Sequence, residues 1–394
     1  MSTYSRLFNY EARVEKIRLK MEKQGIDILI LNRLSSMFYV GGAYLNVYRP
    51  GAVIIIPLNG QVSMVARAME LDRLATETWI KNIKGWVAWD TNLYKAKSFV
   101  DCIADIFKEN NLLKESNGTI GIEIGSEQEP GSISYGFYSD LANKFSNKKL
   151  VNASNILDEV VLVKEPEEIP FIRDACAILD TGHEAVLRAL KVGVTEVEIA
   201  GVAEYAMRKV GMEWSVLQPM VFSGYRASYF NEGEGSPTTK IIQRGDAVCI
   251  DLMPTRHLYV GDIHFTVYMG ERTDEQKRLS DTVEEIIEKI IELAKPGAVV
   301  ADIDKMIREK KREKGYGDCD AWLTGHGLGL APRCGPYFTP NNNTILEPNM
   351  IIEPIVLVFP PGVGGVGMEF PLLIGEKRPE VLTKTPLKVQ TISI

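Results

Sequence analysis

The first 160 residues alternate between the helical and the strand period of hydrophobic positions. Apolar side chains recur at helical spacing over residues 10–25, and an apolar run of strand length follows at 26–32. Residues 51–66 are typical of two strands joined at Asn59 and Gly60, because both residues tolerate the positive φ angles of a tight hairpin turn. Further helix and strand patterns follow. This alternation predicts an α/β layer domain.

The pattern changes near residue 160, and a long helix starts at Glu165 and Pro166. We therefore predict a domain boundary there, with one domain over residues 1–160 and a second over 161–394. Apolar strands occur in the second domain, and the Gly-rich stretch 360–367 between two of them predicts a long hairpin loop. Three more helical patterns lie at 196–210, 273–295 and 299–314.

Composition narrows the class of protein. A formal charge of −7 over 394 residues argues against nonspecific binding to nucleic acid or to an anionic membrane. No apolar run reaches the roughly eighteen residues of a membrane-spanning helix, and the N-terminus lacks the apolar core of a signal peptide. The five cysteines do not have the spacing of a disulfide framework or a zinc knot. We expect a soluble, cytoplasmic protein with no nucleic-acid or membrane partner.

Five ionisable side chains stand alone inside apolar or Gly-rich stretches. They are Asp251, Asp262, His326, Glu353 and Glu369. A single buried acid of this kind can be satisfied by backbone amides, but each further unpaired charge adds a desolvation cost. Four carboxylates and one imidazole together suit two divalent cations, and this oxygen-rich set favours manganese, cobalt, iron or zinc. The sequence therefore predicts a dinuclear metal site.

The residues around these side chains resemble a known family. The order of the five, with "GHGLG" around His326 and "IIEP" around Glu353, is similar to the pita-bread metallopeptidases, which include methionine aminopeptidases, Xaa-Pro aminopeptidases, prolidases and creatinase. The first domain and the junction "LVKEPEEI" resemble the prolidase and creatinase branch. The resemblance implies an α/β (α+β) chain whose pseudo-twofold catalytic domain, residues 161–394, is built around a curved antiparallel sheet.

The resemblance also implies an activity and an assembly. A metal-dependent hydrolase of Xaa-Pro dipeptidase type would cleave a small peptide or amide bond with a hydroxide that bridges the two metal ions. Glu353 would be catalytic as a proton shuttle as well as a metal ligand. A homodimer is expected, in which the first domain of one subunit edges the active site of the other. Local support for this contact comes from the aromatic residues Trp79, Trp86 and Trp89.

Two histidines that this family uses to hold the substrate are missing. Arg333 stands seven residues after His326, where one of them is expected, and the segment "SYFNEGEGSPTTKIIQRGD" contains no histidine. Arg333 cannot act as a base because its guanidinium stays protonated, but it could clamp a substrate carboxylate or pair with a protein acid such as Glu234. The alternative is an arginine that points to solvent. We predict substrate binding by Arg333, Glu234 and Tyr229.

His264 lies in "DIHFT", where this family usually has "D-x-T-R-T". It could be a catalytic residue that replaces the lost hydrogen-bonding capacity, or a strand histidine that faces a polar layer. Three functions stay open at this point. The first is the peptidase, and the second is hydrolysis of a nonpeptide C–N bond, or a lyase reaction, on the same fold, favoured by the likeness of "PTTKIIQRGD" to creatinase. The third is a metal- or peptide-binding relative with little peptidase activity.

Overall fold

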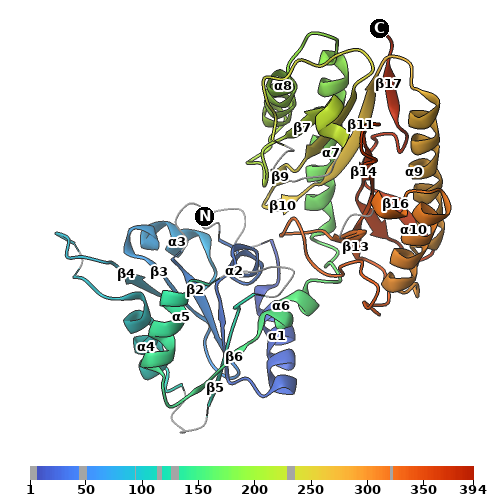
Figure 1. Cartoon of the computed structure of the whole chain (residues 1–394). Coiled ribbons are helices and arrows are strands. Elements are labelled where there is room, and N and C mark those ends of the chain that lie inside the picture. The colour runs from blue at the N-terminus through green and yellow to red at the C-terminus, as the bar shows by residue number, and fades with distance from the viewer. Residues whose placement is uncertain are drawn as a thin grey trace. The chain divides into compact units, whose positions relative to one another are not determined.

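The computed structural model divides the chain into two compact units, Met1–Val160 and Val161–Ile394 (Figure 1). It describes residues 7–43, 51–93, 95–112, 118–125, 133–228, 236–319 and 323–394. No helix among these residues is long and apolar enough to span a membrane. The two units have separate sheets and separate hydrophobic cores.

The first unit is a six-stranded mixed sheet with the strand order β4-β3-β2-β1-β5-β6. Its strands are β1 Ile28–Leu31, β2 Val53–Pro57, β3 Ser63–Arg67, β4 Asn82–Trp86, β5 Thr119–Ile122 and β6 Lys149–Asn152. Its helices are α1 Tyr10–Gln24, α2 Leu34–Gly41, α3 Leu71–Glu77, α4 Phe99–Glu109, α5 Tyr135–Lys144 and α6 Ser154–Val160. The pairs β1–β2 and β2–β3 are antiparallel, and the other pairs are parallel. The predicted α/β layer architecture is confirmed.

Local sequence explains the element boundaries in this unit. α1 starts after Asn9, whose side chain accepts a hydrogen bond from the backbone N–H of Ala12, and it ends at Gly25 with φ of 65°. The antiparallel β2 and β3 are joined through the predicted turn residues Asn59 and Gly60, and Gly60 has φ of 115°. β1 is buried over its whole length, as its unbroken apolar pattern requires at the centre of a sheet.

The second unit is built on a larger, mainly antiparallel sheet with the order β16-β15-β13-β14-β11-β8-β7, to which β12 adds beside β13 and β17 beside β11. Its strands are β7 Met220–Ser223, β8 Ala247–Leu252, β11 Ile263–Met269, β12 Gly325–Gly327, β13 Ile351–Val358, β14 Val366–Glu369, β15 Leu372–Ile374, β16 Pro379–Val381 and β17 Gln390–Ile392, with the small pair β9 Thr255–Arg256 and β10 Tyr259–Val260. Its helices are α7 Ile169–Ala189, α8 Glu196–Lys209, α9 Asp274–Leu293 and α10 Val300–Glu313. This arrangement agrees with the expected antiparallel sheet.

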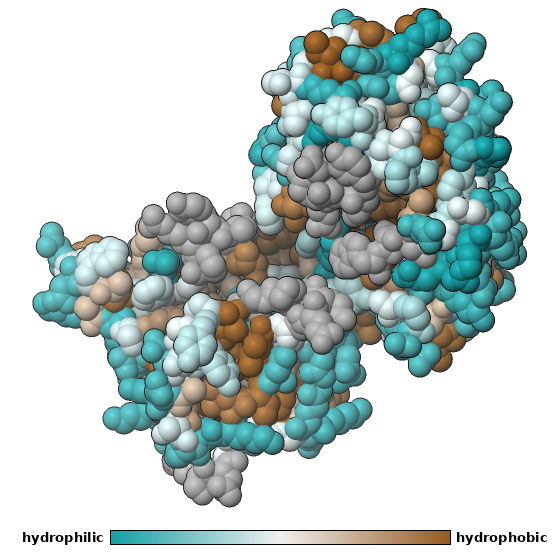
Figure 2. All heavy atoms as spheres, viewed as in Figure 1, coloured by the Kyte–Doolittle hydropathy of each residue, from teal (hydrophilic) through white to brown (hydrophobic). Residues whose placement is uncertain are grey.

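Two hydrophobic cores hold the second unit together. Residues of β8 and β11 that point to one face, such as Ile250 and Phe265, pack with α7 and α8. The other core joins α9 and α10 to β13 and β14 through residues such as Ile286 and Val356. Figure 1 shows the two helix pairs on opposite sides of the strands, and Figure 2 shows a mostly hydrophilic surface over α9 and α10. The strands that carry the predicted ligands therefore lie in the interior of the unit.

Three of the helices and the loop predicted for this unit are confirmed. The predicted start of the long helix at Glu165 and Pro166 is wrong, because α7 begins only at Ile169, after a turn in which the side chain of Glu168 accepts a hydrogen bond from the backbone N–H of Glu165. α8, α9 and α10 match the three helical patterns to within two residues at each end. α8 and α9 begin with capping boxes, formed by Thr195 with Glu198 and by Thr273 with Gln276. The Gly-rich stretch joins the antiparallel strands β13 and β14. All five cysteines are free thiols.

Candidate metal centre

Strand register brings three of the candidate side chains to one face of the sheet. His264 on β11 lies directly opposite Asp251 on β8, and on its other side it lies opposite Glu369 on β14. Residues that are directly opposite on antiparallel strands project to the same face. The three side chains therefore meet in the middle of the sheet.

The same register adds the remaining three residues. Asp262 directly precedes β11, two positions before His264, and its side chain reaches His326 on the same face. Glu353 on β13 lies two positions before the partner of Glu369. His326 on β12 lies opposite Glu353. All five predicted ligands, together with His264, are thus brought to one face by the pairing of β8, β11, β12, β13 and β14.

The side chains form two groups with the spacing of metal ligands. One group is Asp251, His264 and Glu369, the other is Asp262, His326 and Glu369, and in each the ligand atoms lie within 4.8 Å of one another. Nδ1 of His264 is 3.6 Å from Oδ2 of Asp251, and Nε2 of His326 is 4.0 Å from Oδ2 of Asp262. Two ligands of one ion with bonds of about 2.0–2.2 Å are at most about 4.4 Å apart. Both separations fit that span.

Several buried polar atoms of this face have no hydrogen-bond partner among the described residues. Both carboxylate oxygens of Asp262 and of Glu353 make no hydrogen bond to any described residue, although both side chains are fully buried. Nε2 of His326 is also without a partner, while Nδ1 lies 3.0 Å from the carbonyl oxygen of Gly327. A ring that donates from Nδ1 to this carbonyl presents Nε2 as a metal ligand. Atoms in this state fit divalent cations, which would satisfy all of them at once.

The two fully buried acids resist ionisation. Burial, and then the negative charges of Asp251 and Glu369, hold the pKa of Asp262 well above its usual range. Burial, followed by Asp262 and Glu369, does the same to the pKa of Glu353. Such groups ionise readily when positive charge is placed among them, and a divalent cation supplies it compactly.

The two histidines are shifted in opposite directions. Burial lowers the pKa of His326 to about 3, and the positive charge of Arg333 acts in the same direction. Burial also disfavours the charged form of His264, but the neighbouring Asp251 outweighs it and raises the pKa of His264 to about 10. Metals bind the neutral imidazole, so a cation beside Asp251 would take the place of the His264 proton.

A tight loop after His326 brings Arg333 toward the site. The backbone of Gly327 exchanges two hydrogen bonds with that of Cys334, with N···O distances of 2.7 and 3.1 Å. Glycine is required at this position, because a Cβ on Gly327 would lie 1.9 Å from the carbonyl oxygen of Gly335. The charge of Arg333 then acts on Asp262 as well as on His326.

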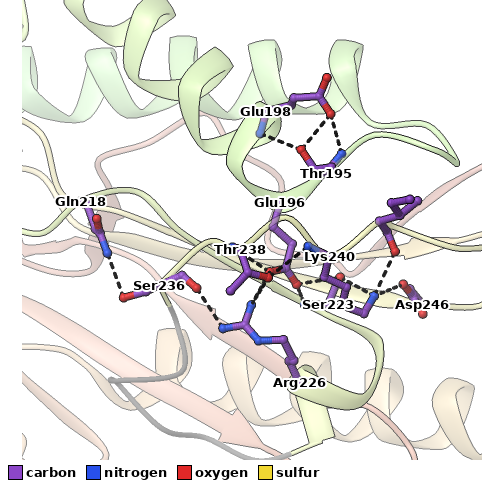
Figure 3. A network of polar contacts seen from close by, with 11 residues as sticks. Thr195, Glu196, Glu198, Gln218, Ser223, Arg226, Ser236, Thr238, Lys240 and Asp246 are labelled. Carbon is purple, nitrogen blue, oxygen red and sulfur yellow. Dashed lines mark hydrogen bonds and ion pairs between the residues drawn. The ribbon is translucent and has the colours of Figure 1, made fainter.

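The other two predicted substrate-binding residues, Tyr229 and Glu234, lie outside the described residues. The chain on both sides of them is held by Glu196, a buried acid whose role the sequence does not indicate, because it looks like an ordinary first-turn acid of α8. Its carboxylate accepts hydrogen bonds from the backbone N–H and the hydroxyl of both Ser223 and Thr238 (Figure 3). It thus ties β7 to the loop that precedes β8.

Arg226 adds further contacts to the hydrogen bonds that Glu196 makes on both sides of the segment with Tyr229 and Glu234. It forms an ion pair with Glu196, and its Nη2 donates to the carbonyl oxygen of Ser236 at 2.9 Å (Figure 3). Lys240 reaches Asp246 at 2.7 Å in the neighbouring part of the network. The residues that flank Tyr229 and Glu234 are therefore held by the buried ion pair of Arg226 and Glu196.

Comparison with known proteins gives the class of this arrangement. The chain is similar to the prolidase from Pyrococcus horikoshii OT3, with a TM-score of 0.81, 27% identity, and coverage of 95% of this chain and 99% of that chain. It is also similar to the Xaa-Pro dipeptidase from Bacillus anthracis, with a TM-score of 0.84, 25% identity, and coverage of 98% and 100%. The architecture is that of the pita-bread metallopeptidases that carry an N-terminal domain.

Family models agree with the structural likeness. The model of metallopeptidase family M24 matches residues 170–376, and the model of the Creatinase/Prolidase N-terminal domain matches residues 13–162. The Xaa-Pro dipeptidase of Pyrococcus furiosus is 28% identical over 95% of this chain and 98% of its own length. The chain belongs to metallopeptidase family M24, and the resemblance seen in the sequence is confirmed. It is a hydrolase of the metallopeptidase class.

Proposed function

We propose that the chain is a dinuclear metal-dependent peptidase that hydrolyses Xaa-Pro dipeptides. The Pyrococcus relatives that align over nearly their whole length carry the name Xaa-Pro dipeptidase, which supports this substrate class. The observation that carries the proposal is the set of buried side-chain atoms on Asp262, His326 and Glu353 that have no hydrogen-bond partner in the part of the chain that the structure describes. Asp251 and Glu369 lie on the same face.

These five residues would hold two divalent cations, with manganese, cobalt, iron and zinc as candidates. The bound cations would polarise the scissile carbonyl and acidify a water molecule. Glu353 would accept a proton from the attacking water and return it to the leaving nitrogen, because both of its oxygens are buried on this face without a hydrogen-bond partner among the described residues. The interior position of the strands would keep bulk water away from this proton transfer.

Arg333 would recognise the C-terminal carboxylate of the dipeptide, together with Tyr229 and Glu234. Its charge acts on Asp262 and His326, and a permanent cation beside a metal centre is favourable when an anion lies between them. Arg333→Ala should weaken binding of carboxylate-bearing substrates by about 1.5–3 kcal/mol, the scale of a charge-assisted hydrogen bond, and leave metal content unchanged.

Steady-state kinetics on dipeptides and their C-terminal amides measure this effect. Arg188→Ala is the matched control, because Arg188 is an exposed arginine on α7 that pairs with Glu184. Equal kinetics of Arg333→Ala and wild type on both kinds of substrate would remove Arg333 from substrate recognition.

The substrate class is tested by a hydrolysis screen with added manganese or cobalt. The panel contains Xaa-Pro dipeptides, other dipeptides and small N-substituted amides. Preference for Xaa-Pro dipeptides supports the proposal. Cleavage of nonpeptide amides alone would favour the second candidate, hydrolysis of a nonpeptide C–N bond, for which the presence of Arg333 in place of a family histidine is the supporting observation.

We also propose a cytoplasmic homodimer. Trp79 and Trp86 are used within the first unit, because their indole N–H groups donate to the carbonyl oxygens of Val40 and Gly51 at 2.7 and 2.6 Å. Trp89 is 71% exposed and is the one of the three tryptophans that a partner could cover. Light scattering that finds a stable 44.0 kDa monomer at micromolar concentration would contradict the dimer.

A further inference from the structure

His264 occupies the middle of the metal-site face. It lies between Asp251 and Glu369 on the two neighbouring strands, and one atom from each of the three side chains lies within 4.8 Å of the others. The distance of 3.6 Å between Nδ1 of His264 and Oδ2 of Asp251 is too long for a hydrogen bond. It is within the span of two ligands on one ion.

The His264 ring is packed on several sides but has no hydrogen bond to a described residue. The side chain is 1% exposed, and neither ring nitrogen has a hydrogen-bond partner among the described residues. Phe222 and Phe359 meet the ring edge to face, with centroids at 6.0 and 6.5 Å. Gly367 leaves room for the ring, because a Cβ there would lie 2.5 Å from Nε2. A buried imidazole in this state is costly unless its nitrogens gain a partner.

We propose that His264 is a metal ligand that completes, with Asp251 and Glu369, a second nitrogen-containing position beside the one formed by Asp262, His326 and Glu369. The inference rests on the proposed metal centre and assigns His264 to the ions rather than to the hydrogen-bonding role expected from the sequence. Glu369 is common to both positions. Because each position then contains an imidazole, the centre favours zinc, cobalt or iron over manganese.

The test is titration of the ion-free protein with Co(II) and with Zn(II), followed by visible absorption and calorimetry. The variants are His264→Gln and, as matched control, His183→Gln. His183 is a buried histidine of the same unit whose Nε2 lies 2.9 Å from the side-chain oxygen of Gln390. We expect His264→Gln to weaken one of two bound ions by about 100-fold or more and to change the Co(II) spectrum, since even outer-shell changes cost about 10–100-fold. His183→Gln should match the wild type.

Each outcome bears on a different claim. If the wild type binds two ions and His264→Gln binds both with unchanged affinity and spectrum, His264 is not a ligand and the metal centre stands. If the wild type binds no ion, the inference and the proposed function both fail.

A measurement on the wild type avoids any effect of the substitution on folding. The chain has four histidines, so labelled imidazole nitrogens can be resolved by NMR after loading with a spin-active cadmium isotope. Scalar coupling to cadmium reports a direct metal–nitrogen bond. Coupling to His264 and His326 is the expected result, and coupling to His326 without His264 would overturn the inference.

Discussion

Glu123 in the first unit and Glu353 in the second are both fully buried acids, but they differ in their partners. Glu123 accepts hydrogen bonds from the backbone N–H groups of Asn32 and Arg33, at 2.8 and 3.0 Å, and from the hydroxyl of Ser36. It thereby caps the start of α2, where the helix dipole favours a negative charge. Neither oxygen of Glu353 has such a partner among the described residues. The hydrogen-bonding capacity of Glu123 is satisfied within the protein, whereas that of Glu353 would be satisfied by a cation.

The contrast lies between satisfied and unsatisfied acids and not between the two units, because Glu196 in the second unit is satisfied as fully as Glu123. A raised pKa does not separate the two kinds. Burial raises the pKa of Glu123 despite the opposing charge of Arg33, and burial raises the pKa of Glu353 as well. Hydrogen-bond partners therefore separate the two kinds of buried acid better than burial or pKa does.

Asp262→Asn should have the largest effect on activity. It removes the charge of a proposed ligand, and the lost stabilisation of several kcal/mol corresponds to about a 1,000-fold lower kcat/KM together with loss of bound metal. The same change should raise the Tm of the ion-free protein at neutral pH, because Asp262, whose pKa is raised by burial, must take up a proton to be buried there and an asparagine does not. Dipeptide hydrolysis, metal analysis and thermal unfolding measure the three quantities. A variant that keeps its metal and hydrolyses dipeptides within about tenfold of the wild-type rate would contradict the assignment of Asp262 as a metal ligand.

Glu123→Ala should have the opposite profile. Three donors at the start of α2 lose their acceptor, so we expect a loss of about 3 kcal/mol in the free energy of unfolding with metal content unchanged. Urea unfolding followed by circular dichroism measures the loss, and Glu123→Gln should recover part of it. A loss below about 1 kcal/mol would show that Glu123 does not hold this end of α2.

His183→Gln should have the smallest effect, a change in the pH dependence of the unfolding free energy. It extends the comparison from buried acids to buried histidines. Burial lowers the pKa of His183 despite its hydrogen bond to Gln390. A folded-state pKa below the unfolded value means that the unfolded chain binds more protons, so stability falls as pH drops below about 6.5. Between pH 7.5 and 5.5 the wild type should therefore lose more unfolding free energy than His183→Gln, by at most about 1.4 kcal/mol. Parallel pH profiles of the two proteins would argue that His183 is not held neutral.

The sequence predicts the structure well where neighbouring residues decide it. The hairpin at Asn59 and Gly60 and the start of α9 at Thr273 follow from turn and capping residues within a few positions of each other. The candidate ligands are recognisable because an acid in an unbroken apolar run, as at Asp251 or Glu353, needs a partner that local sequence does not provide.

Contacts between distant segments decide the rest. Strand register places His264 between Asp251 and Glu369, and no local pattern reveals which residues will be opposite one another. For the same reason Glu196 looks like a common helix-start acid, although its partners lie on β7 and at Thr238. The position of a side chain among apolar neighbours is therefore predictable, but its partner is not.

Metal binding by the ion-free wild-type chain tests most directly whether the unpartnered buried acids mark a dinuclear centre. Calorimetric titration with Mn(II), Co(II) and Zn(II) should give about two ions per chain. Stability should rise by about 2.7 kcal/mol per site at a free metal concentration of about 100 times Kd. Glu123→Ala should behave like the wild type, and Asp262→Asn should not. Fewer than about one ion per chain for every metal, with no rise in Tm, would contradict the account.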